Sequence, residues 1–273
     1  GEEGVASSRV LFVRKKGKTR EVWMMDYDGA RQQQITHEGS IVMMPNWSAD
    51  GSTIFYTSFL DGYPNLRMIS VGEQKSKRVL PQGIHAYGAK ANPDGERIVY
   101  SRQTQQGAND LWIYNLKTGA NQRLTYHPAI ETSPEWAPNG WSIAFTSDKG
   151  GRPQLYTIEA DGTGEERLTY VSTYVESAAW SPQGDKIAYC AMIDGKFDLF
   201  VLNIGTGQTT QLTSGPGNDE TPSWSADGRL IMFASDRTGS YQLYLIRPDG
   251  SGLVQLTRSA ESSSAPRWSP RRK

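Results

Sequence analysis

The sequence predicts an all-β protein: a six-bladed β-propeller with four antiparallel strands in each blade, closed by a C-terminal strand that completes the first blade. Three observations predict this fold. A short motif centred on tryptophan recurs every 44 or 45 residues, short apolar runs bounded by turn residues follow each copy, and no segment of eleven or more residues has helical periodicity. Repeats of this length, each with about four strand-like runs, are typical of propeller blades.

The recurring motif defines an anchor position in each repeat. Successive anchors are separated by 44, 45, 44, 44 and 44 residues. We expect each anchor tryptophan on the innermost strand, where its ring fills the wedge between neighbouring blades. Alanine stands at the second anchor, so another residue should fill that wedge. The six anchors are Trp47, Ala91, Trp136, Trp180, Trp224 and Trp268.

Each anchor is followed by two apolar runs and a tight turn. In the repeat that begins at Trp136, the runs lie at 143–145 and 155–158, and Asp161-Gly162 separates them from the closing pair Leu168-Thr169. The runs are short, β-branched and aromatic, which favours strands over helices. Because they lack clean alternation of apolar and polar residues, both faces of each sheet should be covered.

The two ends of the chain complement each other. Residues 10–36 carry strand-like runs without an anchor before them, whereas the anchor at 267–270 has no strands after it. Pairing the last strand with the first hairpin would complete a sixth blade and remove two exposed sheet edges. We therefore predict one domain over residues 10–270, with 1–9 as the remnant of a linker and 271–273 as a tail.

Composition excludes several classes of protein. The formal net charge is +0 without a basic stripe, which argues against nucleic-acid binding, and no apolar run is long enough to cross a membrane. The single cysteine, Cys190, excludes an internal disulfide and a cysteine-rich zinc site, and we expect it to be buried. There are three histidines and no nucleophile elbow, zinc-protease motif or phosphate loop. We therefore predict no catalytic residue, no metal ligand and no cofactor.

The candidate site lies just before the anchors, where each innermost strand begins at one mouth of the central channel. Four positions before the anchors stand Tyr87, Thr132, Glu176 and Glu220 in four of the blades, and one position earlier stand Glu131 and Asp219 in two of them. Symmetry predicts that the four carboxylates converge on one rim and focus a negative potential there. Such a rim suits a cationic partner segment or a calcium ion. Alternatively, these carboxylates accept backbone N–H bonds at the strand starts. The apolar run 41–44 at the same rim is either a docking patch or ordinary packing.

The cassette from Trp136 to Thr169 resembles the repeat of the TolB-type six-bladed propeller, a member of the PD40/WD40-like repeat family, and the resemblance covers residues 10–270. Residues 1–9 are similar to the junction that follows the amino-terminal α/β domain in that family. The resemblance implies a non-catalytic, periplasmic component of the Tol-Pal cell-envelope system. It implies docking of the peptidoglycan-associated lipoprotein Pal over the channel mouth, use of the same face by colicin segments, and calcium in the channel.

Two site residues follow from the resemblance: His85 and Thr132 match family positions implicated in Pal binding. The remaining rim residues, Tyr87, Glu131, Glu176, Asp219 and Glu220, extend that site by symmetry. We expect a monomer. The repeat also occurs in propellers that gate prolyl-oligopeptidase-type peptidases, and related rings form metal-dependent lyases and lactonases. An enzyme domain and a scaffold for another partner therefore remain alternative interpretations.

Overall fold

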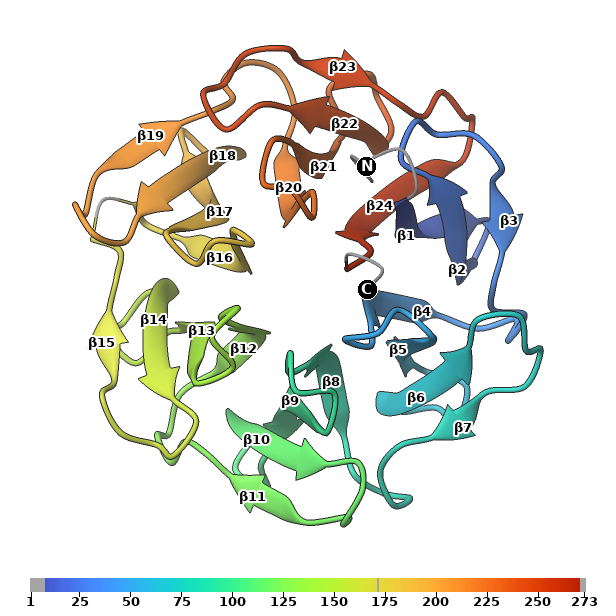
Figure 1. Ribbon diagram of the computed structural model, residues 1–273, viewed down its shortest axis with the longest axis vertical. Coiled ribbons are helices and arrows are strands. Elements are labelled where there is room, and N and C mark those ends of the chain that lie inside the picture. Colours follow the sequence, from blue (N-terminus) through green and yellow to red (C-terminus); the bar gives the residue numbers. More distant parts are fainter. Residues whose placement is uncertain (1–7, 171, 271–273) are drawn as a thin grey trace, which may run out of the picture.

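The computed structural model describes residues 8–170 and 172–270, which form six four-stranded antiparallel sheets arranged as blades around a central axis (Figure 1). The described residues contain strands β1–β24 and no helix. The predicted six-bladed propeller is confirmed. Most of the predicted linker and the whole predicted tail lie outside the described residues, and Arg9 already belongs to β1.

Each blade has the same order of strands from the channel to the outer wall. The innermost strands are β24 (Ser262–Trp268), β4 (Val42–Trp47), β8 (Ala86–Ala91), β12 (Glu131–Trp136), β16 (Val175–Trp180) and β20 (Asp219–Trp224), for blades 1 to 6. The second strands are β1 (Arg9–Lys16), β5 (Thr53–Ser58), β9 (Arg97–Gln103), β13 (Ser142–Ser147), β17 (Lys186–Ile193) and β21 (Ile231–Ser235). The third strands are β2 (Thr19–Asp26), β6 (Asn65–Ser70), β10 (Asn109–Asn115), β14 (Gln154–Glu159), β18 (Lys196–Asn203) and β22 (Gln242–Ile246).

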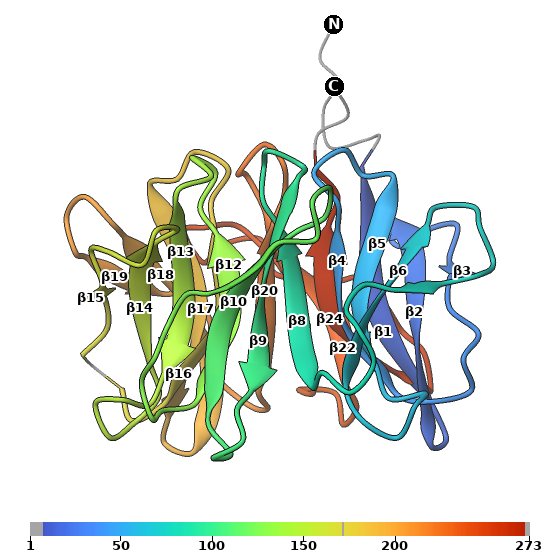
Figure 2. The same cartoon turned by 90° about the horizontal axis from the view of Figure 1, so that it is seen from below.

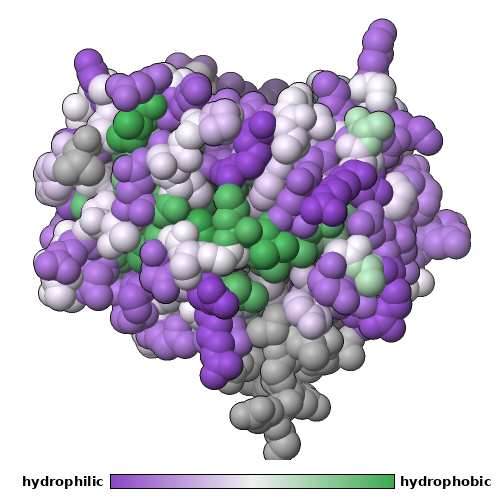
Figure 3. Space-filling view, turned by 90° about the horizontal axis from the view of Figure 1, so that it is seen from above, coloured by the Kyte–Doolittle hydropathy of each residue, from purple (hydrophilic) through white to green (hydrophobic). Residues whose placement is uncertain are grey.

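The outermost strands are short and mostly polar, which suits an exposed sheet edge because it discourages pairing with another chain. They are β3 (Gln33–Gln34), β7 (Lys77–Arg78), β11 (Asn121–Arg123), β15 (Glu166–Arg167), β19 (Thr209–Gln211) and β23 (Val254–Gln255). Figure 3 looks onto the wall that carries blade 6, where an apolar band crosses an otherwise polar surface. At β23, Leu253 and Val254 are about half exposed.

The ring closes as the sequence predicts. Strand β24 pairs with β1, with Trp268 opposite Val10, so the last strand of the chain completes the first blade. Beyond the paired residues, the amide of Ser269 donates to the carbonyl of Arg9 at 2.8 Å. The side view shows the inner strands running along the axis between two faces (Figure 2). No described element is a helix that is long and apolar enough to cross a membrane.

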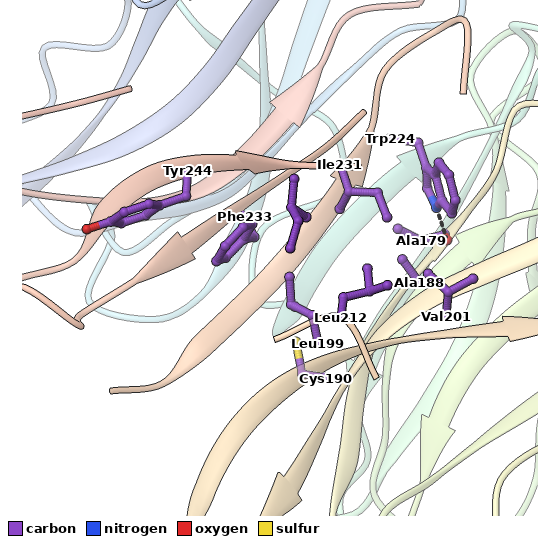
Figure 4. Close-up of a cluster of buried hydrophobic side chains, with 11 residues drawn as sticks. Ala179, Ala188, Cys190, Leu199, Val201, Leu212, Trp224, Ile231, Phe233 and Tyr244 are labelled. Carbon is purple, nitrogen blue, oxygen red and sulfur yellow. Dashed lines mark hydrogen bonds between the residues drawn. The ribbon is translucent and has the colours of Figure 1, made fainter. Parts of the chain in front are cut away.

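The hydrophobic core is divided among the interfaces between blades. Residues of blades 5 and 6 form one such cluster, which includes Trp224, Ile231 and the buried Cys190; Trp224 lies at one end of it and Cys190 at the other (Figure 4). The indole N–H of Trp224 donates to the carbonyl of Ala179 in the preceding blade at 2.9 Å. Each anchor tryptophan thus sits in the wedge, as predicted, and here it also bonds one blade to the next.

The wedge at the second anchor differs. Here other side chains occupy the wedge, as expected: the buried Phe55 of blade 2 packs in one cluster with Ile98 of blade 3, and Met68 and Ala91 pack against that cluster. A cavity of about 820 Å³ lies beside it, between the turns of the two blades. Phe55 and Met68 of blade 2 line this cavity, and Ala91 contributes only a methyl group to the neighbouring channel mouth.

Candidate functional site

A β-bulge shapes the start of every innermost strand and decides which side chains reach the channel. In each blade the pairing with the second strand shifts register within the inner strand. The residue three positions before each anchor has a positive φ, between 51° and 63°. A bulge places two residues opposite one and turns the strand locally. The six bulge residues are Met44, Gly88, Ser133, Ser177, Thr221 and Ala265.

The bulge sorts the rim positions by burial. Residues five positions before the anchors are buried in all six blades, whereas those four positions before are partly exposed. The latter, together with the bulge residues other than the buried Gly88 and with residues flanking the strand start, are available at the channel mouth. We call this mouth, where the inner strands begin, the strand-start mouth.

Glu176 and Glu220 occupy matching rim positions in the neighbouring blades 5 and 6. Burial raises the pKa of Glu176 above its usual value, and the nearby carboxylate of Glu220 raises it further. Burial also raises the pKa of Glu220, with Asp236 and Asp219 adding to the effect. These shifts show two carboxylates close together and partly shielded from water, where their field is stronger than in bulk solvent.

Tyrosine hydroxyls hold both carboxylates. Tyr241 donates to Glu220 Oε1 at 2.8 Å, and the hydroxyl of Tyr174 favours the charged form of Glu176. Burial, followed by the adjacent glutamate, raises the pKa of both tyrosines, so their protons stay in place as donors at neutral pH. Tyr174 and Tyr241 are not among the site residues predicted from the sequence, although Tyr174 lies six positions before its anchor, the place that His85 holds in blade 3.

The structure does not place Glu131 and Asp219 at the rim as predicted. Glu131 has no exposed surface, and Asp219 is 2% exposed and pairs with Arg237 at 2.7 Å inside blade 6. Both precede a rim position by one residue, and neighbouring residues of a strand point to opposite faces. Burial raises the pKa of Glu131 to about 7, although Thr125 and Lys149 favour its charged form.

His85, Tyr87 and Thr132 do lie at the strand-start mouth. His85 is exposed, stacks on Tyr63 with ring centroids 5.0 Å apart, and has Nδ1 at 3.1 Å from Gln103 Oε1. Tyr87 and Thr132 are partly exposed at the position before the bulge in blades 3 and 4. Their role in binding stays a prediction.

Apolar side chains surround the same mouth in blades 2 to 4. Ile41 and Met44 are more than a third exposed and Ile130 is half exposed, whereas Val42 is fully buried. The run 41–44 was expected to be either a docking patch or ordinary packing. Part of it packs inside the blade and part of it faces solvent, so each interpretation holds for some of its residues. Ile130, which holds in blade 4 the position of Ile41, is not among the residues predicted from the sequence. The rim is thus apolar and aromatic on one side and acidic on the other.

The opposite mouth, where the inner strands end at the tryptophans, has different chemistry. Lys90 and Glu135 form an ion pair at 2.6 Å there, and Arg267 donates to the carbonyl of Pro222. Burial, and then the charge of Arg267, lower the pKa of Lys90 to about 8, although Glu135 opposes this shift. Five anchor tryptophans line the cavity of about 680 Å³ at this mouth. The charged residues among those that line this cavity are Glu135 and Arg267, one of each sign.

The rim offers no metal cluster among the residues that the structure describes. Within 8–170 and 172–270, no three side chains of His, Cys, Asp or Glu come together to share an ion. Calcium usually takes six to eight oxygen ligands, and the pair of Glu176 and Glu220 supplies a small part of that set. We assign no metal site here. Cys190 is buried, and burial raises the pKa of its thiol well above the usual value.

The family of the chain is known from its match to a family model. The family model described as the TolB beta propeller domain matches residues 1–198 and 175–273, which together cover the chain. The chain belongs to this family. Over 135 residues it is 36% identical to the Tol-Pal system protein TolB of Anaeromyxobacter dehalogenans, covering 50% of this chain and 31% of that protein. The TolB of Bordetella pertussis is 32% identical over 164 residues, covering 59% of this chain and 37% of that protein.

These matches span only about a third of the length of the curated TolB relatives. Among solved structures, TolB from Acinetobacter baumannii superposes with a TM-score of 0.89 at 22% identity, covering 98% of this TolB-type propeller and 68% of that chain. Enzymes share the architecture. An oligogalacturonate lyase from Vibrio parahaemolyticus superposes with a TM-score of 0.62 at 15% identity, covering 92% of this chain and 74% of that one. The fold alone therefore does not decide between binding and catalysis.

Proposed function

We propose that this TolB-type propeller is a non-catalytic, periplasmic protein-binding module of the Tol-Pal cell-envelope system, and that it binds Pal at the strand-start mouth. One observation carries the proposal: the rim joins a pair of carboxylates, Glu176 and Glu220, to exposed apolar side chains, Ile41, Met44 and Ile130, around a single opening. Membership of the TolB propeller family and the Tol-Pal name of the curated relatives support it.

The rim chemistry suits a protein segment better than a reacting substrate. Exposed apolar and aromatic side chains provide the surface that a partner desolvates, and partly buried charges select its orientation and speed its approach. A partner that places lysine or arginine against Glu176 and Glu220, and apolar side chains against Met44 and Ile130, would complement both halves. Tyr174 and Tyr241 fix the carboxylates in advance, which lowers the cost of ordering them on binding.

Titration calorimetry with purified soluble Pal tests this proposal. The double variant Glu176→Gln and Glu220→Gln keeps the shape of both side chains and removes their charge, and we expect it to weaken binding at least about ten-fold. The matched control is Glu73→Gln with Asp249→Asn, since both residues lie in exposed turns at the opposite face. The control should bind as the unmodified chain does, and raising the salt concentration should weaken only variants that keep the rim charges.

A second variant tests the apolar and aromatic half. His85→Ala removes the ring that stacks on Tyr63, and Met44→Ser removes an exposed thioether at the bulge. We expect each to weaken Pal binding several-fold while circular dichroism stays unchanged. Unaltered affinity in all three rim variants, or absence of Pal binding by the unmodified chain, would refute the proposed site.

A further inference from the structure

The channel has a second mouth that the proposed function does not use. We call it the strand-end mouth, because the inner strands of all six blades end there at their anchors. It holds a cavity of about 680 Å³, to which every blade contributes lining residues. Small-molecule sites typically enclose about 300–1,000 Å³ and are mainly apolar with a few polar groups. The size of this cavity therefore suits a small organic ligand.

The outer part of the cavity is apolar. Two positions after each anchor stands an alanine or a proline, and these six residues form a lip around the opening. They are Ala49, Pro93, Pro138, Pro182, Ala226 and Pro270. Five anchor tryptophans line the wall next to this lip. An apolar group placed here would leave water and gain contacts with carbon atoms on every side.

The deeper part of the cavity is polar. One position before each anchor, every inner strand contributes one residue to a ring around the axis. In the order of the blades (Figure 1), the ring consists of Arg267, Asn46, Lys90, Glu135, Ala179 and Ser223. All of these except Lys90 line the cavity. Since they precede the anchors and the lip follows them, a ligand that enters from outside meets the apolar lip first and the polar ring last.

The two charged residues that line the cavity differ in their pairing. Glu135 Oε2 lies 2.6 Å from Nζ of the buried Lys90, so Glu135 already has a counter-ion. Arg267 Nη1 donates to the carbonyl of Pro222 at 3.1 Å, but within residues 8–170 and 172–270 no carboxylate pairs with its guanidinium. The pKa of Lys90 is lowered to about 8 by burial and then by the charge of Arg267, so this charge acts within the ring. The cavity therefore offers a ligand a cation without a counter-ion.

Asn46 adds hydrogen-bond donors beside this cation. It holds in blade 2 the position that Arg267 holds in blade 1, and the two strands are neighbours, since Trp47 Nε1 donates to the carbonyl of Arg267 at 3.1 Å. The side-chain amide of Asn46 has no hydrogen-bond partner in the described part of the chain, and it is not sealed from solvent. A guanidinium and an amide at adjacent positions can donate to the two oxygens of one carboxylate.

We propose that the cavity at the strand-end mouth binds an apolar carboxylate, whose carboxyl group lies against Arg267 and Asn46 and whose apolar part lies between the tryptophans and the lip. A free small acid and the carboxyl terminus of a peptide share this chemistry. The carboxylate supplies the counter-ion that Arg267 lacks, and the apolar surroundings strengthen the attraction between the two charges. The site does not depend on Pal binding, since it lies at the mouth opposite the proposed Pal site.

Calorimetry with 3-phenylpropionate tests the proposal. The neutral 3-phenylpropionamide and the cationic 3-phenylpropylamine keep the apolar part of this probe, whereas acetate keeps only its carboxylate. We expect saturable binding of 3-phenylpropionate and at least about ten-fold weaker binding of each of the other three. Equally tight binding of 3-phenylpropionamide, or no saturable binding of 3-phenylpropionate at millimolar concentration, would overturn the proposal.

An acetylated tripeptide that ends in phenylalanine distinguishes the two sources of the carboxylate. Tighter binding of this peptide than of 3-phenylpropionate would assign the site to peptide termini, and weaker binding would assign it to free small acids. In either case, the same peptide with an amidated terminus should bind at least about ten-fold more weakly than the free acid.

Arg267→Gln removes the charge and keeps a hydrogen-bonding side chain. We expect it to lower the affinity for 3-phenylpropionate at least about ten-fold and to change the affinity for 3-phenylpropionamide little. Arg229→Gln is the matched control, because Arg229 lies in an exposed turn of the same face outside the cavity. The control should bind 3-phenylpropionate as the unmodified protein does. Equal effects of the two arginine variants would count against the site.

Asn46→Asp is a second cavity variant, which keeps the test open if Arg267→Gln does not fold. It places a carboxylate next to Arg267, where it would compete with the ligand, and should lower the affinity for 3-phenylpropionate at least about ten-fold. Glu176→Gln at the other mouth should leave this binding intact, which separates the test from that of Pal binding. Unchanged binding in whichever cavity variant folds would contradict the assignment.

Discussion

At the scale of single residues, the position of a carboxylate relative to the bulge determines what it does. Glu176 stands four positions before its anchor and faces the channel mouth beside a tyrosine hydroxyl. Glu131 stands five positions before the anchor of its own blade and has no exposed surface. Burial without a full set of partners disfavours the charged form, and this raises the pKa of Glu131 to about 7. The same residue type therefore supplies a binding charge in one blade and a titrating buried group in another.

Glu131 should make the stability of the protein depend on pH. Its pKa is about 7 in the folded state and about 4.5 when unfolded, so between these values the folded protein holds a proton that the unfolded chain has lost. Stability contributed by this group is therefore highest at low pH and falls as the pH rises from about 4.5 to about 7, by about 1–3 kcal/mol. Urea unfolding at a series of pH values measures this slope.

Glu131→Gln is the variant that isolates the effect. It should flatten the slope between pH 5 and 7 and raise the free energy of unfolding above pH 7, whereas Glu73→Gln on an exposed turn should change neither. Part of the slope should remain, because burial raises the pKa of Glu176 and Glu220 in the same direction. An identical slope in Glu131→Gln and the unmodified protein would contradict this prediction.

At the scale of elements, the inner strand shows what could be predicted from the sequence and what could not. The period of the anchors and the apolar runs after them predicted the six blades and their closure correctly, because both patterns are repeated along the chain. The facing of Glu131 and Asp219 was predicted wrongly. A shift of one residue reverses the face that a side chain occupies, and the bulge residues, such as Thr221 and Ser133, carry no sequence signature of a left-handed conformation.

The anchor tryptophans pack between neighbouring blades, but only some of them also form a hydrogen bond to the preceding blade. The indole groups of Trp47, Trp136 and Trp224 donate to a carbonyl of the preceding blade. Within the described residues, the buried Nε1 of Trp180 has no hydrogen-bond partner. The sequence predicted the packing of all these rings from their spacing, but it could not distinguish which of them also form the bond.

This difference predicts unequal costs of a single substitution. Trp224→Phe removes the donor and leaves the carbonyl of Ala179 without it, in addition to reducing the packed volume. Trp180→Phe reduces the volume similarly but has no hydrogen bond to lose. We expect Trp224→Phe to lower the free energy of unfolding by about 1–2 kcal/mol more than Trp180→Phe. Urea titrations measure this difference, provided that the dependence of the unfolding free energy on urea concentration is the same in both variants. Trp136→Phe should behave like Trp224→Phe. Equal losses of unfolding free energy in Trp224→Phe and Trp180→Phe would contradict the role of the hydrogen bond.

At the scale of the whole molecule, stability depends on closing the ring. The pairing of β24 with β1 joins residues more than 240 positions apart and completes blade 1. The closure also continues past the strands, because Arg9 N donates to Ser269 Oγ at 3.0 Å and Trp268 Nε1 donates to Ser8 Oγ at 2.7 Å. Without this strand, β1 would present an unpaired edge along the channel, and the face of blade 6 that contacts Trp268 would be uncovered.

Removal of residues 262–273 should therefore abolish the monomeric fold. The shortened chain loses a full strand together with the ring of Trp268, and its exposed edge favours association with other copies. The decisive comparison is a permuted chain in which residues 259–273 precede residue 1, because it retains every residue and turns β24 and β1 into a hairpin. We expect the permuted chain to unfold cooperatively as a monomer in light scattering, and the shortened chain to aggregate or to lack a cooperative transition. A shortened chain that stays monomeric and unfolds with unchanged stability would show that the five complete blades hold the ring without the closing strand.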